Sequence, residues 1–137
     1  MKSSWLLVLL AALPLAAAAE ERGPRIDYIL ECQGCHLDSG AGRPPDVPRL
    51  TDRVGWFLQI SGGREYLVQV PGSANAPITD AALAEVLNFM IEKFAGPSMP
   101  ESFVRYTEEE VARLRPVRPL DIDATRHRLT TEVARFE

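Results

Sequence analysis

The pattern of apolar and polar residues predicts a chain built from helices and loops. The longest periodic stretch is "ITDAALAEVLNFMIEKF", residues 78–94. Its large apolar side chains recur at spacings of three and four residues and form one broad stripe: Leu83, Val86, Leu87, Met90, Ile91 and Phe94. Thr79 and Asp80 are typical of a helix start, and Gly96-Pro97 is typical of a helix end. One long amphipathic helix is therefore predicted here.

Shorter helices are predicted on both sides of this stretch. Segment 23–32, "GPRIDYILEC", begins with a Gly-Pro helix start and places Ile26, Ile29 and Leu30 on one apolar face. Further short helices are predicted in "TDRVGWFLQI" (51–60), "REYLVQV" (64–70) and "YTEEEVARLR" (106–115). The intervening stretch 39–50 is rich in Pro and Gly and predicts a loop. The pattern as a whole predicts an all-α fold.

The C-terminal part of the chain carries a second well-defined helix start. Thr107 and Glu110 have the spacing of a capping box, and Tyr106 and Val111 are placed as the hydrophobic staple around it. Pro116 ends this helix, and the tail beyond it is mostly polar, with a further helix predicted in its second half.

The N-terminal composition predicts export. Lys2 is followed by an apolar run over residues 5–13, and residues 17–19 are all Ala, as at a signal-peptide cleavage site. Pro14 interrupts the apolar stretch, which is shorter than the roughly 17–25 residues of a membrane-spanning helix. We predict a signal peptide over residues 1–19, a periplasmic mature protein, and no membrane span once the signal is removed.

The charge balance narrows the class of partner. The chain has 19 acidic and 15 basic residues, a formal net charge of −4, and the loss of Lys2 with the signal would make it more negative. An acidic surface argues against binding to nucleic acid or anionic membranes. It favours docking to a basic patch on a partner protein.

The two cysteines of the chain stand close together in "CQGCH", where Cys32 and Cys35 are followed directly by His36. A disulfide at this spacing would close a very small loop and stabilise little. A structural zinc site needs four ligands, and the sequence has no second pair of Cys or His residues with ligand spacing. A thioredoxin-like dithiol would require a βαβ pattern around the motif, which is not predicted.

Covalent haem attachment uses every residue of this motif. Two thiols at this spacing form thioethers with one porphyrin, and the adjacent imidazole binds its iron. Export agrees with this chemistry, because thioether haem proteins mature outside the cytoplasm. We predict one haem c bound through Cys32 and Cys35, with His36 as the proximal iron ligand.

Several residues near the motif are candidate partners of such a haem. Four arginines could bind the haem propionates: Arg43, Arg49, Arg53 and Arg64. A carbonyl of Pro45 or Pro48 could accept a hydrogen bond from the ring N–H of His36 and so orient the imidazole.

The chain resembles the small mono-haem class I cytochromes c. The resemblance covers approximately residues 24–95 and rests on "CQGCH", on "REYLVQVPG" and on the long helix that follows. It implies an all-α domain wrapped around one covalent haem, in which the first helix packs across the long one. With the signal peptide removed, it divides the chain into a haem domain, 20–95, and a C-terminal extension, 96–137. The extension would contribute a distal-ligand loop, a short helix and a polar tail.

The resemblance leaves the second axial ligand open. Family members usually present a Met, often in a Met-Pro pair, just before the final helix, where this chain has Ala76-Pro77. Met99, in a loop between two prolines, is the favoured candidate. Met90 lies on the apolar stripe and is expected in the core, and His127 would give a haem with two His ligands. With none of these bound, the iron would be five-coordinate.

These features predict a one-electron carrier rather than an enzyme. Its donor would be a dehydrogenase-type enzyme, and its acceptor a cytochrome or an oxidase. Two alternatives stay open: a five-coordinate c-type haem protein that binds or senses a small ligand, and a dedicated haem subunit of a larger oxidoreductase complex. Axial ligation separates them, because a saturated iron is suited to passing electrons whereas an open position admits ligands.

Overall fold

A computed structural model of the protein describes residues 22–137, so the predicted signal peptide, 1–19, lies outside the described residues. Within residues 22–137 all regular structure is helical, and strand-like pairing is confined to one isolated bridge between Arg43 and Val47. The predicted all-α fold is therefore confirmed. None of the helices in this part of the chain is both long and apolar enough to span a membrane.

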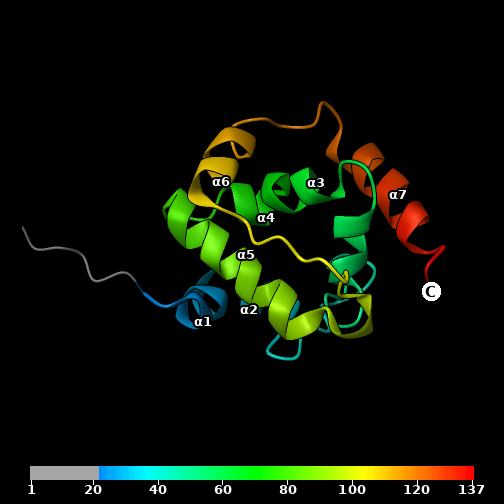
Figure 1. Cartoon of the computed structure of the whole chain (residues 1–137), viewed down its shortest axis with the longest axis horizontal. Helices are drawn as coiled ribbons and strands as arrows, with labels where there is room; N and C mark the ends of the chain where they lie inside the picture. The colour runs from blue at the N-terminus through cyan, green and yellow to red at the C-terminus, as the bar shows by residue number, and fades with distance from the viewer. Residues whose placement is uncertain (1–21) are drawn as a thin grey trace, which may run out of the picture.

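The segment predicted as the first helix is a run of three short helical elements. They are α1 (Pro24–Asp27), the π-helical η1 (Tyr28–Cys32) and α2 (Gln33–His36). The remaining elements are η2 (Val54–Gln59, a 3-10 helix), α3 (Gly63–Gln69), α4 (Pro71–Ala74), α5 (Asp80–Phe94), η3 (Gly96–Ser98, a 3-10 helix), α6 (Glu108–Leu114) and α7 (Ile122–Val133). In Figure 1, α5 crosses the face of the molecule, and α1 and α7 lie on opposite sides of it.

Helix α5 is the centre of the core. All six apolar residues of its predicted stripe are buried. Its start is also as predicted, since the Thr79 hydroxyl accepts a hydrogen bond from the Ala82 N–H at 3.1 Å. Helices α1 and α6 both pack against α5, so the helix that leads into the cysteine motif contacts the long helix as the resemblance implied.

The apolar face predicted for the first helix points to solvent and not into the core. Ile26, Ile29 and Leu30 are exposed, and the neighbouring residues Asp27 and Tyr28 are buried instead. The five-residue π turn at Tyr28 changes the rotation of the helix relative to the regular spacing on which the prediction was based. The contacts of Tyr28 with the core, and not the local apolar pattern, therefore decide which side of this helix is buried.

Tyr28 fixes the rotation of this helix through contacts far along the chain. Its ring packs at a tilt against Phe94 and Phe89 of α5, with centroid distances of 5.4 and 5.9 Å. Its hydroxyl donates a 2.6 Å hydrogen bond to the carbonyl of Leu37, immediately after α2. Burial, the largest cause, raises the pKa of Tyr28 to about 12, so this hydroxyl keeps its proton at neutral pH.

Residues from the extension are part of the same hydrophobic core. Tyr106, Val111, Leu129 and Val133 are buried in one cluster with the side chains of α5. The segment between η3 and α6 runs back across α5 (Figure 1) and is tied to it through Asn88, whose side-chain amide both donates to and accepts from the backbone of Tyr106. The division at residue 95 stays a prediction, but the two parts share a core.

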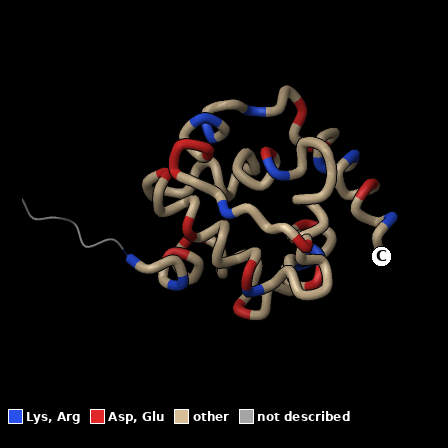
Figure 2. Tube along the Cα trace, viewed as in Figure 1, with Lys and Arg blue, Asp and Glu red and all other residues tan. Residues whose placement is uncertain are grey.

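One of the two hydrogen bonds expected for the predicted capping box of α6 is formed. The Thr107 hydroxyl accepts from the Glu110 N–H at 3.2 Å, as expected. The Glu110 carboxylate binds the Arg64 guanidinium instead, at 2.6 and 2.7 Å. This pair joins the extension to α3, and the Glu110 hydrogen bond is the main cause that raises the pKa of Arg64. Elsewhere acidic and basic residues are interspersed along the described chain, as Figure 2 shows.

Candidate haem-binding site

The cysteine motif lies on one continuous helical segment. Cys32 is the last residue of η1, and Cys35 and His36 end α2. Cys32 is half-buried, Cys35 is exposed, and both are free thiols. Two free thiols and an imidazole within five residues are the donor set that a c-type haem requires, so the residues present fit this group.

The imidazole of His36 is oriented by the loop that follows it. Its Nδ1 lies 3.2 Å from the carbonyl oxygen of Pro48. Because a carbonyl only accepts, Nδ1 carries the proton and the lone pair of Nε2 is left for a metal. Of the two carbonyls considered from the sequence, the structure uses that of Pro48. Burial lowers the pKa of His36 more than this hydrogen bond raises it, which favours the neutral, metal-binding imidazole.

Glycine is required where this loop passes over His36. The Gly42 N–H donates to the His36 carbonyl at 3.0 Å. Gly42 has a φ of +67°, and a Cβ there would lie 2.5 Å from the Pro48 carbonyl oxygen. Only a residue without a side chain fits this backbone. The Gly- and Pro-rich loop predicted from the sequence thus becomes the support of the imidazole.

The electrostatics around Cys32 do not favour a reactive dithiol. Burial, the largest cause, raises the pKa of the Cys32 thiol to about 11, and the charges of Glu31 and Asp27 add to the effect. The thiol is therefore protonated at neutral pH, unlike the low-pKa thiolate of redox-active C-x-x-C motifs. In residues 22–137 no group of three or more His, Cys, Asp or Glu side chains is placed to hold a bare metal ion.

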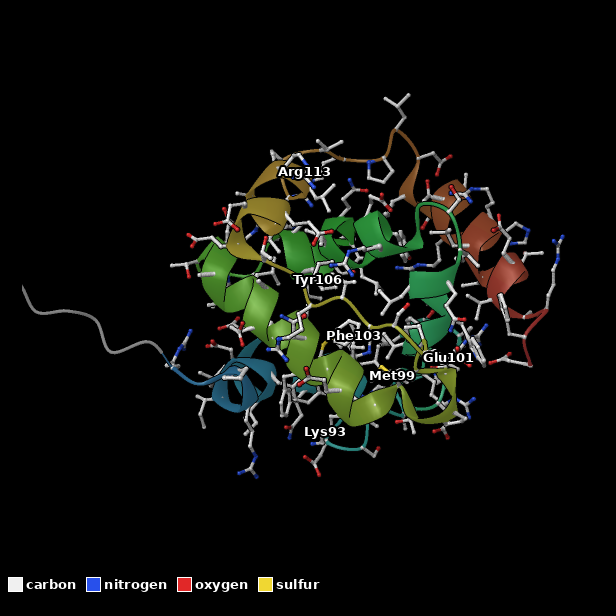
Figure 3. All side chains as sticks on the ribbon, viewed as in Figure 1. Lys93, Met99, Glu101, Phe103, Tyr106 and Arg113 are labelled. Atoms are coloured by element: carbon white, nitrogen blue, oxygen red, sulfur yellow. The ribbon has the colours of Figure 1, made fainter. Side chains whose placement is uncertain are left out.

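The three distal-ligand candidates lie in different environments. Met90 is buried in the core on α5, as the apolar stripe predicted. His127 is exposed on α7. Met99 is partly buried and packs against the hydrophobic core, as does Cys32. Figure 3 shows Met99 and Phe103 near the centre of the view, beside α5. Met99 therefore combines a loop position with contact to the core.

The residue before Met99 is held against η2, a contact that no local sequence pattern predicts. Ser98 is fully buried, and its hydroxyl accepts from the Gly55 N–H at 3.0 Å while donating to the Ala95 carbonyl at 2.6 Å. Its own carbonyl accepts from the Gln59 side chain at 3.0 Å. A Cβ on Gly55 would lie 2.3 Å from that carbonyl oxygen, so the contact is close. The backbone entering Met99 is thus held firmly in place.

A groove of about 640 Å³ opens next to Pro48, between the 44–49 loop, η2 and α7. Its charged or titratable lining residues are mostly basic: Arg49, Arg53, Arg126, His127 and one acid, Asp123. Arg126 also donates to the Tyr66 hydroxyl at 3.1 Å. Sequence reasoning named Arg49 and Arg53 but missed Arg126, because nothing in the local sequence of α7 shows that it folds back over the motif loop.

The predicted propionate partners behave differently in the structure. Arg49 and Arg53 approach Glu137 at 3.9 and 3.4 Å, at the outer range of an ion pair. Arg64 does not line this groove and is engaged by Glu110 and by the carbonyls of Val104 and Arg105. A carboxylate placed beside Pro48 would therefore meet Arg49 and Arg53 rather than Arg64.

The all-α fold and the C-x-x-C-H helix together define a c-type cytochrome. Comparison with known proteins agrees, although no family model matches the chain. The chain is similar to a cytochrome c-552 from one strain of Thermus thermophilus, with 30% identity over 125 aligned positions that cover 78% of this chain and 84% of that protein. A second cytochrome c-552 of Thermus thermophilus is 32% identical over 103 positions, covering 62% of this chain and 79% of that protein. The chain belongs to the small mono-haem cytochrome c family and is an electron-transfer protein.

Proposed function

We propose that the mature protein is a periplasmic one-electron carrier with one haem c, attached to Cys32 and Cys35 and ligated by His36. The observation that carries this proposal is the joint placement of two free thiols and an imidazole whose Nδ1–H is directed to Pro48. The bound haem supplies an iron that changes between the ferric and ferrous states by one electron. The chain supplies the two points of attachment and an imidazole held in a fixed orientation.

The basic groove supports an orientation for the haem. Arg49, Arg53 and Arg126 line a groove together with Pro48, the residue whose carbonyl accepts from His36. Propionate carboxylates would be stabilised there by charge-assisted hydrogen bonds to guanidinium groups. In this arrangement α7 of the extension is part of the haem site.

The proposed partners follow from the chemistry and the charge. A dehydrogenase-type donor would reduce the haem, and a cytochrome or oxidase would accept the electron. The acidic sequence argues against nucleic-acid and anionic-membrane partners, and the predicted export signal over residues 1–19 favours docking to proteins in the periplasm. The alternative, a dedicated haem subunit of a larger complex, is supported by the extension, 96–137. This segment offers additional surface for contacts with other subunits.

Met99 is proposed as the distal ligand, and its replacement is the test of this function. In the ferric wild type we expect a low-spin spectrum with the weak near-infrared sulfur-to-iron band of His/Met ligation. Met99→Ala removes the thioether and should abolish this band. Met90→Leu is the control, because it replaces a core Met by a residue of similar volume. If the band survives in Met99→Ala and is lost in Met90→Leu, Met99 is not the ligand.

A second candidate function is favoured by the Ala76-Pro77 sequence at the place where the family usually presents its Met. Without a distal side chain the iron would be five-coordinate and would bind a small external ligand. The same spectra separate the two functions. A high-spin wild-type spectrum that changes on addition of carbon monoxide would support the ligand-binding function and contradict the saturated electron carrier.

A further inference from the structure

The helix that leads into the cysteine motif presents apolar side chains to solvent. Ile26, Ile29 and Leu30 are 46, 40 and 56% exposed, and we call these three residues the α1 patch. They cannot turn inward, because the opposite side of this helix carries the buried Asp27 and Tyr28 and packs on α5. Exposed apolar residues that cluster in this way, unlike single ones, indicate an interaction site.

The α1 patch is continuous along the chain with the exposed part of the motif. Four residues after Leu30, Gly34 is exposed and has nothing within 4 Å of the position of a Cβ. Cys35, next to it, is exposed as well. A group attached to Cys35 would therefore be held on the same helical segment as the α1 patch, five residues after Leu30.

Two cations lie near the α1 patch, and they differ in their ion pairs. Arg25 is exposed and makes no ion pair with any residue of the described part of the chain. The nearby Arg22, in contrast, lies 3.0 Å from Asp27 and 3.6 Å from Glu31. The neighbouring acids are thus already paired, and the patch presents apolar surface with a single positive charge on a chain of net charge −4.

We infer that the α1 patch is the docking surface for the redox partner. This partner presents an apolar surface with an acidic residue placed to meet Arg25, in place of the basic patch that the net charge alone favours. The inference rests on the proposed haem attachment at Cys32 and Cys35. In the docked complex one electron passes from a reduced one-electron centre of the donor to the ferric iron, which becomes ferrous. No bond or proton is transferred.

The size and charge of the patch favour a transient partner over a second copy of this chain. Stable interfaces bury about 800 Å² on each side, more than three partly exposed side chains provide, whereas electron-transfer encounters are smaller. Two copies meeting through this patch would also bring Arg25 near its equivalent, which is repulsive. A partner with a carboxylate at that position would attract Arg25, whereas a second copy of this chain would repel it.

The test uses the haem-loaded protein on a gold electrode coated with mixed methyl- and carboxylate-terminated alkanethiols, which imitate the inferred partner surface. Leu30→Glu places a charge in the patch and should lower the interfacial electron-transfer rate about tenfold or more, the equivalent of roughly 1.4 kcal/mol. Val117→Glu is the matched control, because Val117 is also 56% exposed and lies on the α6–α7 connection, far from α1 in Figure 1. It should leave the rate within about twofold of wild type, a change of less than about 0.5 kcal/mol.

A further variant tests the charge. Arg25→Gln should slow transfer at low ionic strength and match the wild type at high ionic strength, where exposed charges are screened. The inference is overturned if Leu30→Glu transfers electrons as fast as the wild type, if Val117→Glu is slowed equally, or if sedimentation shows a stable dimer that Leu30→Glu dissociates. A wild-type protein without haem would instead refute the proposed function, so the two failures are distinct.

Discussion

Replacing Cys32 and Cys35 together by serine abolishes covalent haem attachment: we expect the exported C32S/C35S protein to have the mass of its polypeptide alone. A serine hydroxyl does not form the thioether through which a c-type haem is held. The substitution is close in size, and Cys35 is exposed, so the helical segment itself has little reason to unfold. Mass spectrometry of the denatured protein measures the result directly, because any haem bound through its ligands alone is then released.

The single variants are the controls. Cys32→Ser and Cys35→Ser each keep one thiol on the same helical segment and should each retain haem through one remaining thioether, at reduced yield. A haem mass that persists in the denatured double variant would contradict the assignment of these cysteines. A wild type that carries haem but loses it on denaturation would contradict it equally.

Asn88→Leu should lower the free energy of unfolding by about 2–5 kcal/mol, since two buried backbone groups lose their partner and each unsatisfied group costs roughly 1–3 kcal/mol. Asn88 is fully buried; its Nδ2 donates to the Tyr106 carbonyl at 3.0 Å, and its Oδ1 accepts from the Tyr106 N–H at 2.7 Å. Leucine is similar in size but makes neither bond. Denaturant unfolding of the haem-loaded protein, followed by far-ultraviolet circular dichroism, provides the measurement.

A surface variant on the same segment is the control for Asn88. Arg105→Gln removes exposed ion pairs to Glu85 and Glu92. Such pairs contribute about 0–1 kcal/mol, so its stability should stay near that of the wild type. Equal stability of Asn88→Leu and Arg105→Gln would show that the 96–137 segment is not an integral part of the fold.

The sequence predicts those parts of the fold that depend on contacts between residues close together in the chain. Parts that depend on contacts between distant residues are not predicted. The helix at residues 80–94 is encoded by a local apolar period and a local cap at Thr79, and both are present in the structure. The orientation of the first helix is not local, because Tyr28 contacts Phe94 across the molecule. A pattern of ten consecutive residues cannot include that contact, and for that reason the exposure of Ile29 and its neighbours was not predicted.

The same distinction applies to the site. The C-x-x-C-H motif is contiguous, so its chemistry could be inferred without a structure. The choice of Pro48 over Pro45, the contribution of Arg126 and the fixation of Ser98 each depend on segments brought together from distant parts of the chain. Residue types alone do not specify such contacts, and for that reason the distal ligand stays a proposal supported by position.

Covalent haem attachment is tested most directly by the intact mass and the absorption spectrum of the purified wild-type protein, exported from a host that attaches haem c. We expect a red protein whose denatured chain weighs one haem more than residues 20–137, with the spectrum of a c-type cytochrome. A colourless protein with the mass of the bare polypeptide would contradict it.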